Sequence, residues 1–441
     1  MKKRSLAIRM FIAMLLGLGV GFGFLFLREN LLSSNQVGLW NSINNILFQD
    51  ISVEAGSQAI GLFYIVGKLF VNSLQLIIVP MVFTSILLAM CKISDTKKLG
   101  RISYKTIGLF FLTSSIALVF AGIVGYVVYN AGLFNVSIEG INAATGKVGT
   151  NPLNIFVNII PGNILSVFTS NGAVLSIVFL AVVIGYIINV RNKESYIRNL
   201  SEEIHEIITI FLSFVVNKFG PIAIFCLLTR TFAIYGIEHL KPALTYVVTT
   251  VVLLLVYLFV GYALFIFGIG KLNPFHFIRK IAKVAVFGFS TSSSAATLPL
   301  NTQTNIEELG VSEEITSFVL PLGMTINMDG TAIMQVIAAI FIAASGGFEL
   351  TIVNIFVIGI LALIASIGTP AAPGAGAVIL FTVLSGMGYT TDACLLAYSL
   401  ILAINRPIEM LVTSLNVVGD SAAAVCVAKS EQMLDIDKYN N

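Results

Sequence analysis

The chain has 441 residues, of which 57% are hydrophobic and 11% are charged, and its formal net charge is +3. Soluble domains carry roughly 25% charged residues, so this composition excludes an ordinary soluble protein. The small net charge and the lack of a basic tract argue against nucleic acid as a partner. The cysteines lie in or beside apolar segments without metal-ligand spacing, and we interpret them as small buried hydrophobic residues: Cys91, Cys226, Cys394 and Cys426.

Apolar runs fill the first part of the chain, at about 7–27, 61–90, 105–129, 172–190, 206–230 and 243–270. About 20 apolar residues suffice for a helix to cross ~30 Å of hydrocarbon. The first run is too long for a signal peptide and lacks a small-residue cleavage site, so we interpret it as a spanning helix. Basic residues cluster at the N-terminus and after every second run, which predicts that both termini are cytoplasmic. The sequence therefore predicts a multi-pass protein of the cell membrane, surrounded by the lipid bilayer.

The last third of the chain has a different pattern, in which a broken apolar segment is followed by a long helix-like stretch, twice. The broken segments are 274–303 and 350–388, and the helix-like stretches are 317–345 and 392–429. Each broken segment is too short to span twice, so it predicts a re-entrant hairpin whose irregular tip is buried in protein or lines a cavity. Two such hairpins that enter from opposite faces form inverted repeats, which are typical of a transporter's binding site.

The first hairpin tip, FSTSSSAATLP at 289–299, places hydroxyl residues at every position from Ser290 to Ser294. Hydroxyls and unpaired N–H groups at such a tip can hold the carboxylate of a small solute. The alternative is that these side chains bond back to helical carbonyls or pack at helix contacts. Because the hydroxyl residues are consecutive, we favour the binding interpretation.

The two helix-like stretches carry polar residues within apolar sequence. In NMDGT, at 327–331, Gly330 lowers helix propensity and predicts local unwinding, which would free carbonyl groups as ligands. In 392–429, Pro407 removes a helix hydrogen bond, so a bend is possible there. Further along, side chains spaced by four, three and four residues form one polar helix face, which also includes Val412: Glu409, Thr413, Asn416 and Asp420.

Carboxylates within these apolar stretches point to a cation site. A carboxylate in hydrocarbon costs at least about 2.5–3.5 kcal/mol, so it is normally paired or functional. For Glu409 an internal ion pair with Arg406 is one alternative, whereas Asp329 and Asp420 have no basic neighbour in sequence. Oxygen ligands suit a hard cation, and the lack of Cys or His ligands argues against zinc or copper.

Four motifs keep their order and spacing between 284 and 429, and they resemble the dicarboxylate/amino acid:cation symporter family: FSTSSSAATLP, NMDGT, SIGTPAAPGAG and NVVGDSAAAVCVAK. The likeness covers nearly the whole chain in segment order. It implies an all-α polytopic membrane protein with eight transmembrane helices, two re-entrant helical hairpins and inverted repeats. It also implies a homotrimer with an elevator-type motion. Residues 1–270 would be mainly trimerisation scaffold, with helices 3 and 6 joining the transport domain, 271–430 the transport-domain core, and 431–441 a cytoplasmic tail.

The resemblance implies three sodium sites, each built mainly from oxygen atoms. The first combines side chains with carbonyl groups: Asp420, Asn327, Gly323 and Asn416. The second uses carbonyl groups near the second hairpin, with a methionine sulfur close by: Thr325, Ser366, Ile367, Thr369 and Met328. The third involves Asp329, Asn327, Thr113, Ser114 and the carbonyl of Phe110, where the family pattern has tyrosine. Without cations two buried aspartates would be uncompensated, so sodium is expected to bind before or with the substrate.

The resemblance also implies the residues that contact the substrate: Ser292, Ser294, Thr331, Ala372, Gly376, Glu409, Val412, Thr413 and Asn416. Two of these depart from the family pattern. Glu409 stands in place of an aspartate that binds the amino group, and Val412 replaces the arginine that binds the side-chain carboxylate of acidic substrates. The other two places where the family carries a binding arginine hold Ser292 and Met410. Gln335 stands where proton-coupled relatives have glutamate.

These residues predict sodium-coupled secondary active transport of a small neutral amino acid such as serine, threonine or alanine. The alternative is a sodium-coupled symporter of acidic amino acids or dicarboxylates, because Arg406 could replace part of the missing arginine's role. Two other classes compete with a transporter, namely an intramembrane hydrolase and a passive channel. A hydrolase needs a base beside its nucleophile, and every histidine of the chain lies outside the two hairpin tips, so we expect no enzyme: His205, His239 and His276.

Overall fold

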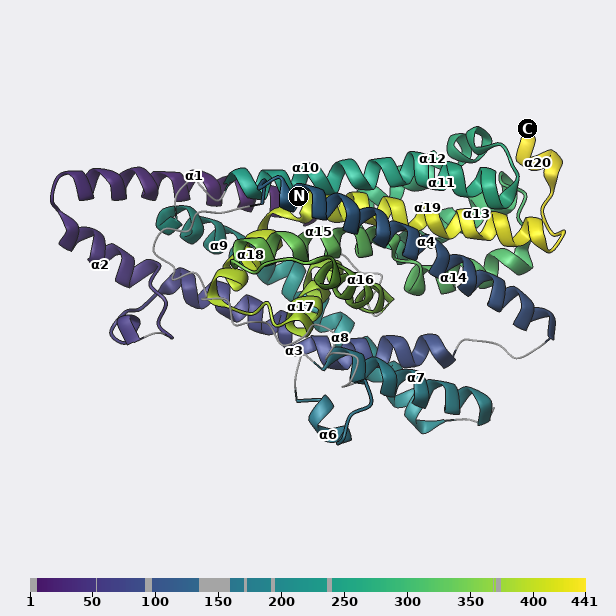
Figure 1. The fold of residues 1–441 in the computed structure, drawn as a ribbon, viewed down its shortest axis with the longest axis horizontal. Helices are drawn as coiled ribbons and strands as arrows, with labels where there is room; N and C mark the ends of the chain where they lie inside the picture. Colours follow the sequence, from purple (N-terminus) through teal and green to yellow (C-terminus); the bar gives the residue numbers. More distant parts are fainter. Residues whose placement is uncertain are drawn as a thin grey trace, which may run out of the picture.

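The computed structural model describes residues 6–52, 54–91, 97–134, 159–169, 173–191, 195–235, 240–367, 369 and 374–441. These residues form helices, with one isolated bridge between Val311 and Leu434. In Figure 1 most of the long helices run along the long axis of the molecule, and the C-terminus lies at one end. The predicted all-α class is confirmed for the part of the chain that the structure describes.

The first 270 residues form helical segments where the apolar runs predict them. They are α1 (Leu6–Ser33), α2 (Val37–Leu47), η1 (Glu54–Gly56), α3 (Leu62–Cys91), α4 (Lys97–Asn130), α6 (Ile164–Val167), α7 (Val174–Arg191), α8 (Tyr196–Phe214), η2 (Val215–Phe219), α9 (Gly220–Tyr235), α10 (Leu240–Val256), η3 (Tyr257–Gly261), α11 (Tyr262–Phe265) and η4 (Ile266–Gly270). The last four run on as one helical segment with π-helical turns at η3 and η4.

The rest of the chain forms pairs of helices separated by short breaks. They are α12 (Pro274–Thr291), α13 (Ser294–Glu307), α14 (Glu313–Ile326), α15 (Asp329–Ser345), α16 (Ile352–Ile367), α17 (Ala375–Met387), α18 (Asp392–Ile404), α19 (Arg406–Ser430) and α20 (Ile436–Asn440). By length and composition, 7 helical segments of the described chain can cross a membrane, and α7, α16, α17 and most of α18 are shorter apolar helices. The chain is thus a multi-pass membrane protein, while the total of eight spans remains a prediction.

Two groups of helices pack around different partners. Helix α3 contacts α7, α8 and α9, and α1 lies along α9. In Figure 1, α3, α7 and α8 lie together on one side, and α1 and α2 reach the end of the molecule opposite the C-terminus. Helices α15 and α19 contact each other and pack against α4, α10, α12 and α14. Nearly all residues of α15 and of α19 from Leu411 to Ala428 are buried, so the polar motifs lie at the centre of the second group.

Helices α12 and α13 form a hairpin. Asn273 caps the start of α12, with Pro274 in its first turn, and Ser292 at its end has a positive φ of 51° that reverses the chain. Ser293 then caps α13. Near the other end of the pair, Lys280 Nζ donates to the carbonyl of Glu308 at 2.9 Å, so the start of α12 lies beside the end of α13. Re-entry of this hairpin into a membrane remains a prediction.

The breaks in the two long helix-like stretches differ from the sequence prediction. The first stretch unwinds at Asn327 and Met328, two residues before Gly330, which itself lies within α15. Glycine is required there for another reason, because a Cβ at position 330 would lie 2.9 Å from the Val412 carbonyl oxygen. The second stretch is not one bent helix but two, α18 and α19, separated at Asn405. Pro407 therefore begins a helix rather than bending one.

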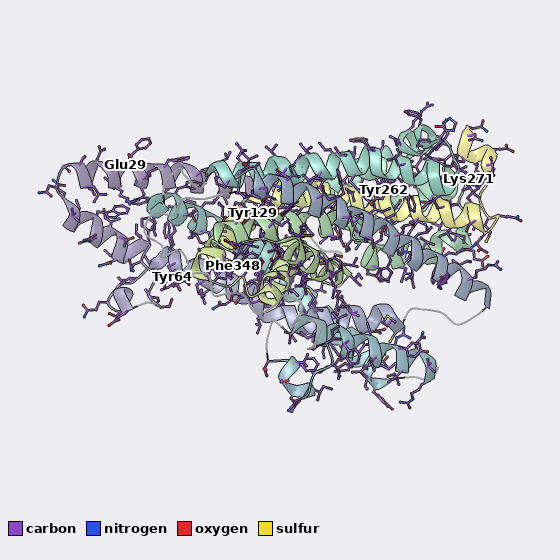
Figure 2. The ribbon with its side chains drawn as sticks, viewed as in Figure 1. Glu29, Tyr64, Tyr129, Tyr262, Lys271 and Phe348 are labelled. Carbon is purple, nitrogen blue, oxygen red and sulfur yellow. The ribbon has the colours of Figure 1, made fainter. Side chains whose placement is uncertain are left out.

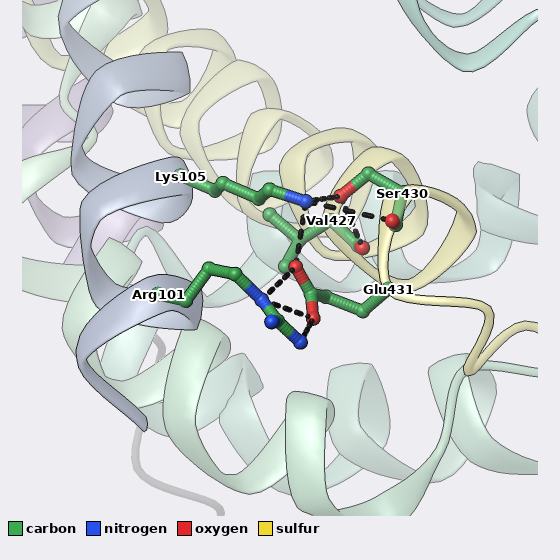
Figure 3. Close-up of polar contacts among 5 residues, drawn as sticks. All are labelled: Arg101, Lys105, Val427, Ser430 and Glu431. Carbon is green, nitrogen blue, oxygen red and sulfur yellow. Dashed lines mark hydrogen bonds and ion pairs between the residues drawn. The ribbon is translucent and has the colours of Figure 1, made fainter. Parts of the chain in front are cut away.

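An ion-pair cluster fixes the C-terminal end of α19 to α4 (Figure 3). Arg101 donates from Nε to Glu431 Oε2 at 2.9 Å, and Lys105 Nζ lies 2.6 Å from Glu431 Oε1. The side chain of Glu431 is 2% exposed. The hydrogen bonds from Arg101 and then Lys105 hold the pKa of Glu431 below its ordinary value.

This cluster predicts a pH-dependent contribution to stability. Because the folded pKa of Glu431 is lowered, its contribution is present above the ordinary carboxyl pKa of about 4.3 and is lost as pH falls through the lowered folded value. Glu431→Gln is therefore expected to lower the unfolding temperature in detergent at neutral pH, and the difference from wild type is expected to shrink towards pH ~3. A difference that is constant over this range would contradict an ionic origin.

Candidate functional site

The breaks of the C-terminal half meet at one cavity beside α19. Its lining residues come from the α12–α13 tip, the α14–α15 break, the start of α15, the α16–α17 tip and the polar face of α19: Ser292, Ser294, Met328, Thr331, Met334, Thr369, Gly374, Gly376, Glu409, Val412, Thr413 and Asn416. Of the positions predicted to contact substrate, all but Ala372 are in this set, and Ala372 lies outside the described residues. The structure thus brings together residues separated by more than a hundred positions in sequence.

The hydroxyl residues of the first hairpin tip divide into two kinds. Ser290 donates to a carbonyl of its own helix at 2.8 Å, Thr291 lies 3.1 Å from the hydroxyl of another tip threonine, and Ser293 caps α13. The hydroxyl groups of these three residues therefore bond within the hairpin, as the alternative interpretation of the hydroxyl cluster predicts. Ser292 and Ser294 instead line the cavity, and the buried Ser292 Oγ has no hydrogen-bond partner. The tip therefore offers the cavity two hydroxyl groups rather than the whole cluster.

Glu409 lies in the first turn of α19 and reaches both the second hairpin and a neighbouring arginine. Its Oε1 accepts the backbone N–H of Ala377 at 3.3 Å, and its Oε2 lies 3.4 Å from Arg406 Nη1. The side chains of Arg406 and Glu409 are 11% and 10% exposed. The predicted alternative for Glu409, an ion pair with Arg406, is therefore present, although Glu409 also lines the cavity.

Asn416 connects α19 to the first turn of α15. Its Oδ1 accepts the Gly330 N–H at 2.8 Å, and its Nδ2 lies 3.2 Å from both Thr331 Oγ1 and Met328 Sδ. Amide, hydroxyl and thioether groups of separate elements are thus held together at the floor of the cavity. Thr413 completes this polar face, and its hydroxyl donates to the Glu409 carbonyl at 3.0 Å.

Asp329 is completely buried below the cavity, where its carboxylate accepts two hydroxyl groups. Ser114 of α4 donates to Oδ1, and Tyr262 of α11 donates to Oδ2 at 2.9 Å. Tyr262 is labelled in Figure 2, where it lies between Tyr129 and Lys271 along the long axis of the molecule. Tyr257 donates to the carbonyl of Thr113 at 2.6 Å and holds the same part of α4 in place.

Asp420 lies one helical turn beyond Asn416 and is 2% exposed. Its Oδ1 accepts Asn327 Nδ2 at 3.1 Å, and Asn327 Oδ1 accepts the Thr113 hydroxyl at 3.3 Å. A Cβ at Gly323 would lie 2.5 Å from Asp420 Oδ1, so only glycine fits beside this carboxylate. In the described chain, no lysine or arginine forms an ion pair with Asp329 or Asp420. Two buried carboxylates surrounded by oxygen donors suit a pair of cations.

The remaining predicted cation ligands have local partners. Thr113 donates to the Phe110 carbonyl at 3.1 Å, close to Asn327. The side chains of Thr325, Ser366 and Thr369 each donate to a carbonyl of their own segment, at 3.0, 2.8 and 2.9 Å. The assembly of Thr325, Ser366, Ile367 and Thr369 into one cation site remains a prediction.

Sequence reasoning missed the tyrosines that contact this site. Tyr262 and Tyr257 lie in an apolar helical segment, where a buried tyrosine hydroxyl normally finds a partner. The need of a buried tyrosine hydroxyl for a hydrogen-bond partner could have drawn attention to these residues, but it does not identify the partner. The π-helical turns at η3, which often occur at functional sites, set the register of these two side chains. Met334 and Gly374 also line the cavity and were not predicted to do so.

Residues 6–430 match the model of the sodium:dicarboxylate symporter family. The proton/sodium-glutamate symport protein of Bacillus caldotenax is 29% identical over 384 residues, which cover 85% of this chain and 89% of that protein. The proton/glutamate-aspartate symporter of Escherichia coli strain K12 is 29% identical over 392 residues, which cover 84% of this chain and 86% of that protein. The C4-dicarboxylate transport protein of Deinococcus deserti is 29% identical over 388 residues, with 84% of each chain covered.

These relatives are named as transporters of acidic amino acids or dicarboxylates, and two of their names include a proton. The match spans both helix groups and every motif that contributes to the cavity. The predictions of a transporter and of no enzyme are confirmed. The chain belongs to the sodium:dicarboxylate symporter family and is a membrane symporter.

Proposed function

We propose that this protein couples sodium entry to the uptake of a small neutral amino acid. The observation that carries the substrate proposal is the charge of the cavity, because none of its described lining residues is basic. A second carboxylate on the substrate would need a cationic partner, and leaving it unpaired costs several kcal/mol. Val412 offers an apolar wall in the cavity, and Thr331 offers a hydroxyl. A side chain such as that of serine, threonine or alanine matches both.

The competing candidate is an acidic amino acid or a dicarboxylate, and the names of the relatives favour it. Arg406 is a candidate cation for such a substrate, because it pairs with Glu409 of the cavity. Arg406 does not line the cavity, and its guanidinium lies 3.4 Å from the Glu409 carboxylate. In the proposed complex the substrate amino group meets Glu409, and its α-carboxylate meets Asn416 and the Ser294 tip.

Sodium is proposed to neutralise the two buried aspartates as the substrate binds. Asp420 with Asn327 supplies one set of oxygen atoms, and Asp329 with Ser114 and the Thr113 region supplies another. The remaining proposed site uses the carbonyl groups near Thr369. Because the cations at Asp420 and at Asp329 each remove an uncompensated buried charge, sodium and substrate binding are expected to favour each other.

The proposed transport cycle is an elevator motion within a homotrimer, with both termini cytoplasmic. Residues 1–270 would supply mainly the scaffold, and 271–430 the moving core. The packing of α3 mainly with α7, α8 and α9, and of α15 and α19 mainly with α4, α10, α12 and α14, supports such a division. The second hairpin tip would be the outer gate, since Gly374 and Gly376 contribute little side chain to hold it closed.

Uptake into liposomes that contain the purified protein tests this function. An inward sodium gradient is expected to drive accumulation of labelled serine above equilibrium, with competition by alanine and threonine but not by aspartate. A pH gradient alone is expected to drive none, because Gln335, whose Nε2 donates to the Gly376 carbonyl at 3.1 Å, is not an acid. Serine uptake in sodium-free medium would contradict sodium coupling, and equilibration without accumulation would indicate a channel.

A further inference from the structure

The charge at the cavity wall depends on one carboxylate. Among the described lining residues, Glu409 is the only side chain that is acidic or basic. Its surroundings are nearly dry, because the side chain is 10% exposed. The side chain of a bound substrate therefore meets a negative wall unless a second protein group compensates Glu409.

Arg406 is placed to give that compensation without touching the cavity. It is the first residue of α19, directly after the break at Asn405. A cation at a helix N-terminus faces the positive end of the helix dipole, so this position is unfavourable without a nearby anion. Glu409 is the anion that the structure provides, with Arg406 Nη1 at 3.4 Å from Oε2.

The guanidinium of Arg406 also has unused hydrogen-bonding capacity. Its Nε is buried and has no partner, and its contact with Glu409 is long for an ion pair. The backbone at the break is fixed, because Tyr246 donates to Asn405 Oδ1 at 2.6 Å and Asn405 Nδ2 lies 3.4 Å from Met334 Sδ. The side chain of Arg406 can therefore change its partner while its backbone stays in place.

We propose that Arg406 is a positioning residue that sets substrate specificity through Glu409. While Glu409 is charged, the ion pair makes this wall of the cavity neutral and keeps the guanidinium away from substrate carboxylates. When Glu409 loses its charge, Arg406 turns towards the cavity, which then accepts an acidic side chain. This inference rests on the proposed function, since it explains how a neutral amino acid is selected.

Binding of serine, aspartate and succinate to wild type, Glu409→Gln and Arg406→Gln/Glu409→Gln tests the proposal. Glu409→Gln weakens serine binding, because the partner of the amino group is lost. The aspartate-to-serine affinity ratio is expected to rise at least tenfold, or about 1.4 kcal/mol, and succinate binding should appear. In the double variant both gains are expected to disappear. An unchanged ratio in Glu409→Gln, or gains that persist in the double variant, would overturn the proposal.

Arg406→Gln alone gives an independent test that does not depend on the folding of Glu409→Gln. This variant leaves the Glu409 charge uncompensated, which favours a substrate with a cationic side chain. The affinity for 2,3-diaminopropionate, a serine analogue with a side-chain ammonium group, is therefore expected to rise at least tenfold relative to the affinity for serine. Arg406→Lys should restore the wild-type ratio of the 2,3-diaminopropionate and serine affinities. Arg230→Gln is the matched control, because Arg230 donates to the Phe48 carbonyl outside this site. Loss of aspartate binding alone in Arg406→Gln would overturn the proposal. The proposed substrate class is tested separately by the wild-type protein, because binding of aspartate without binding of serine would contradict it.

Discussion

Replacing Asp420 with asparagine is expected to weaken sodium binding and substrate binding together, each by at least tenfold, or about 1.4 kcal/mol. Asp420 is 2% exposed, and no lysine or arginine of the described chain pairs with it. A bound cation removes that uncompensated charge, whereas an amide at position 420 gives the cation only a neutral oxygen. The loss reaches the substrate because the coupling of two ligands is reciprocal.

Thermal unfolding in detergent separates a lost cation site from a damaged fold. Asparagine keeps the oxygen that accepts Asn327 Nδ2 at 3.1 Å, and it removes a buried charge, so stability without sodium is not expected to fall. The rise in unfolding temperature on adding sodium should shrink, since that rise reports binding to the folded state. Asp392→Asn is the matched control, because Asp392 is exposed at the start of α18. An undiminished sodium effect and unchanged substrate affinity in Asp420→Asn would contradict the assignment.

The polar face of α19 could be predicted from the sequence because helix geometry alone fixes it. Residues three and four positions apart lie on the same face, so Glu409, Thr413 and Asn416 had to point in one direction wherever the helix packs. The broken segments could be placed for a similar reason, since a backbone that cannot continue as a helix in lipid must line a protein cavity. Both inferences depend on local constraints, which hold whichever element packs beside the segment.

Contacts between distant segments could not be predicted in this way. Tyr262 pairs with Asp329 only because the fold brings this side chain of α11 to the start of α15. Gly330 shows the same limit, since its small size permits the approach of the Val412 carbonyl rather than unwinding. Among the tip hydroxyls, Ser292 differs from Ser290 through its left-handed backbone conformation, which a list of hydroxyl residues does not reveal.

Replacing Val412 with arginine is expected to shift the substrate preference towards aspartate by one or more factors of ten, at about 1.4 kcal/mol each. Val412 lines the cavity, and its backbone is in contact with Gly330, because a Cβ there would lie 2.9 Å from the Val412 carbonyl oxygen. Because the Val412 side chain lines the cavity, a longer side chain at this position is expected to extend into it. Glu409 already pairs with Arg406, so the new guanidinium remains available for the substrate carboxylate.

The affinities of serine and aspartate, measured at saturating sodium in wild type, Val412→Arg and Val412→Leu, decide this prediction. The leucine variant enlarges the side chain but keeps the wall apolar, so it should lower serine affinity by crowding without improving aspartate binding. A ratio that moves equally in both variants would show that cavity volume, and not charge, selects the substrate. Tight aspartate binding by the wild-type protein, together with no response to serine or alanine, would show that a cation already reaches the cavity. In that case the ion pair between Arg406 and Glu409 must open when the substrate binds.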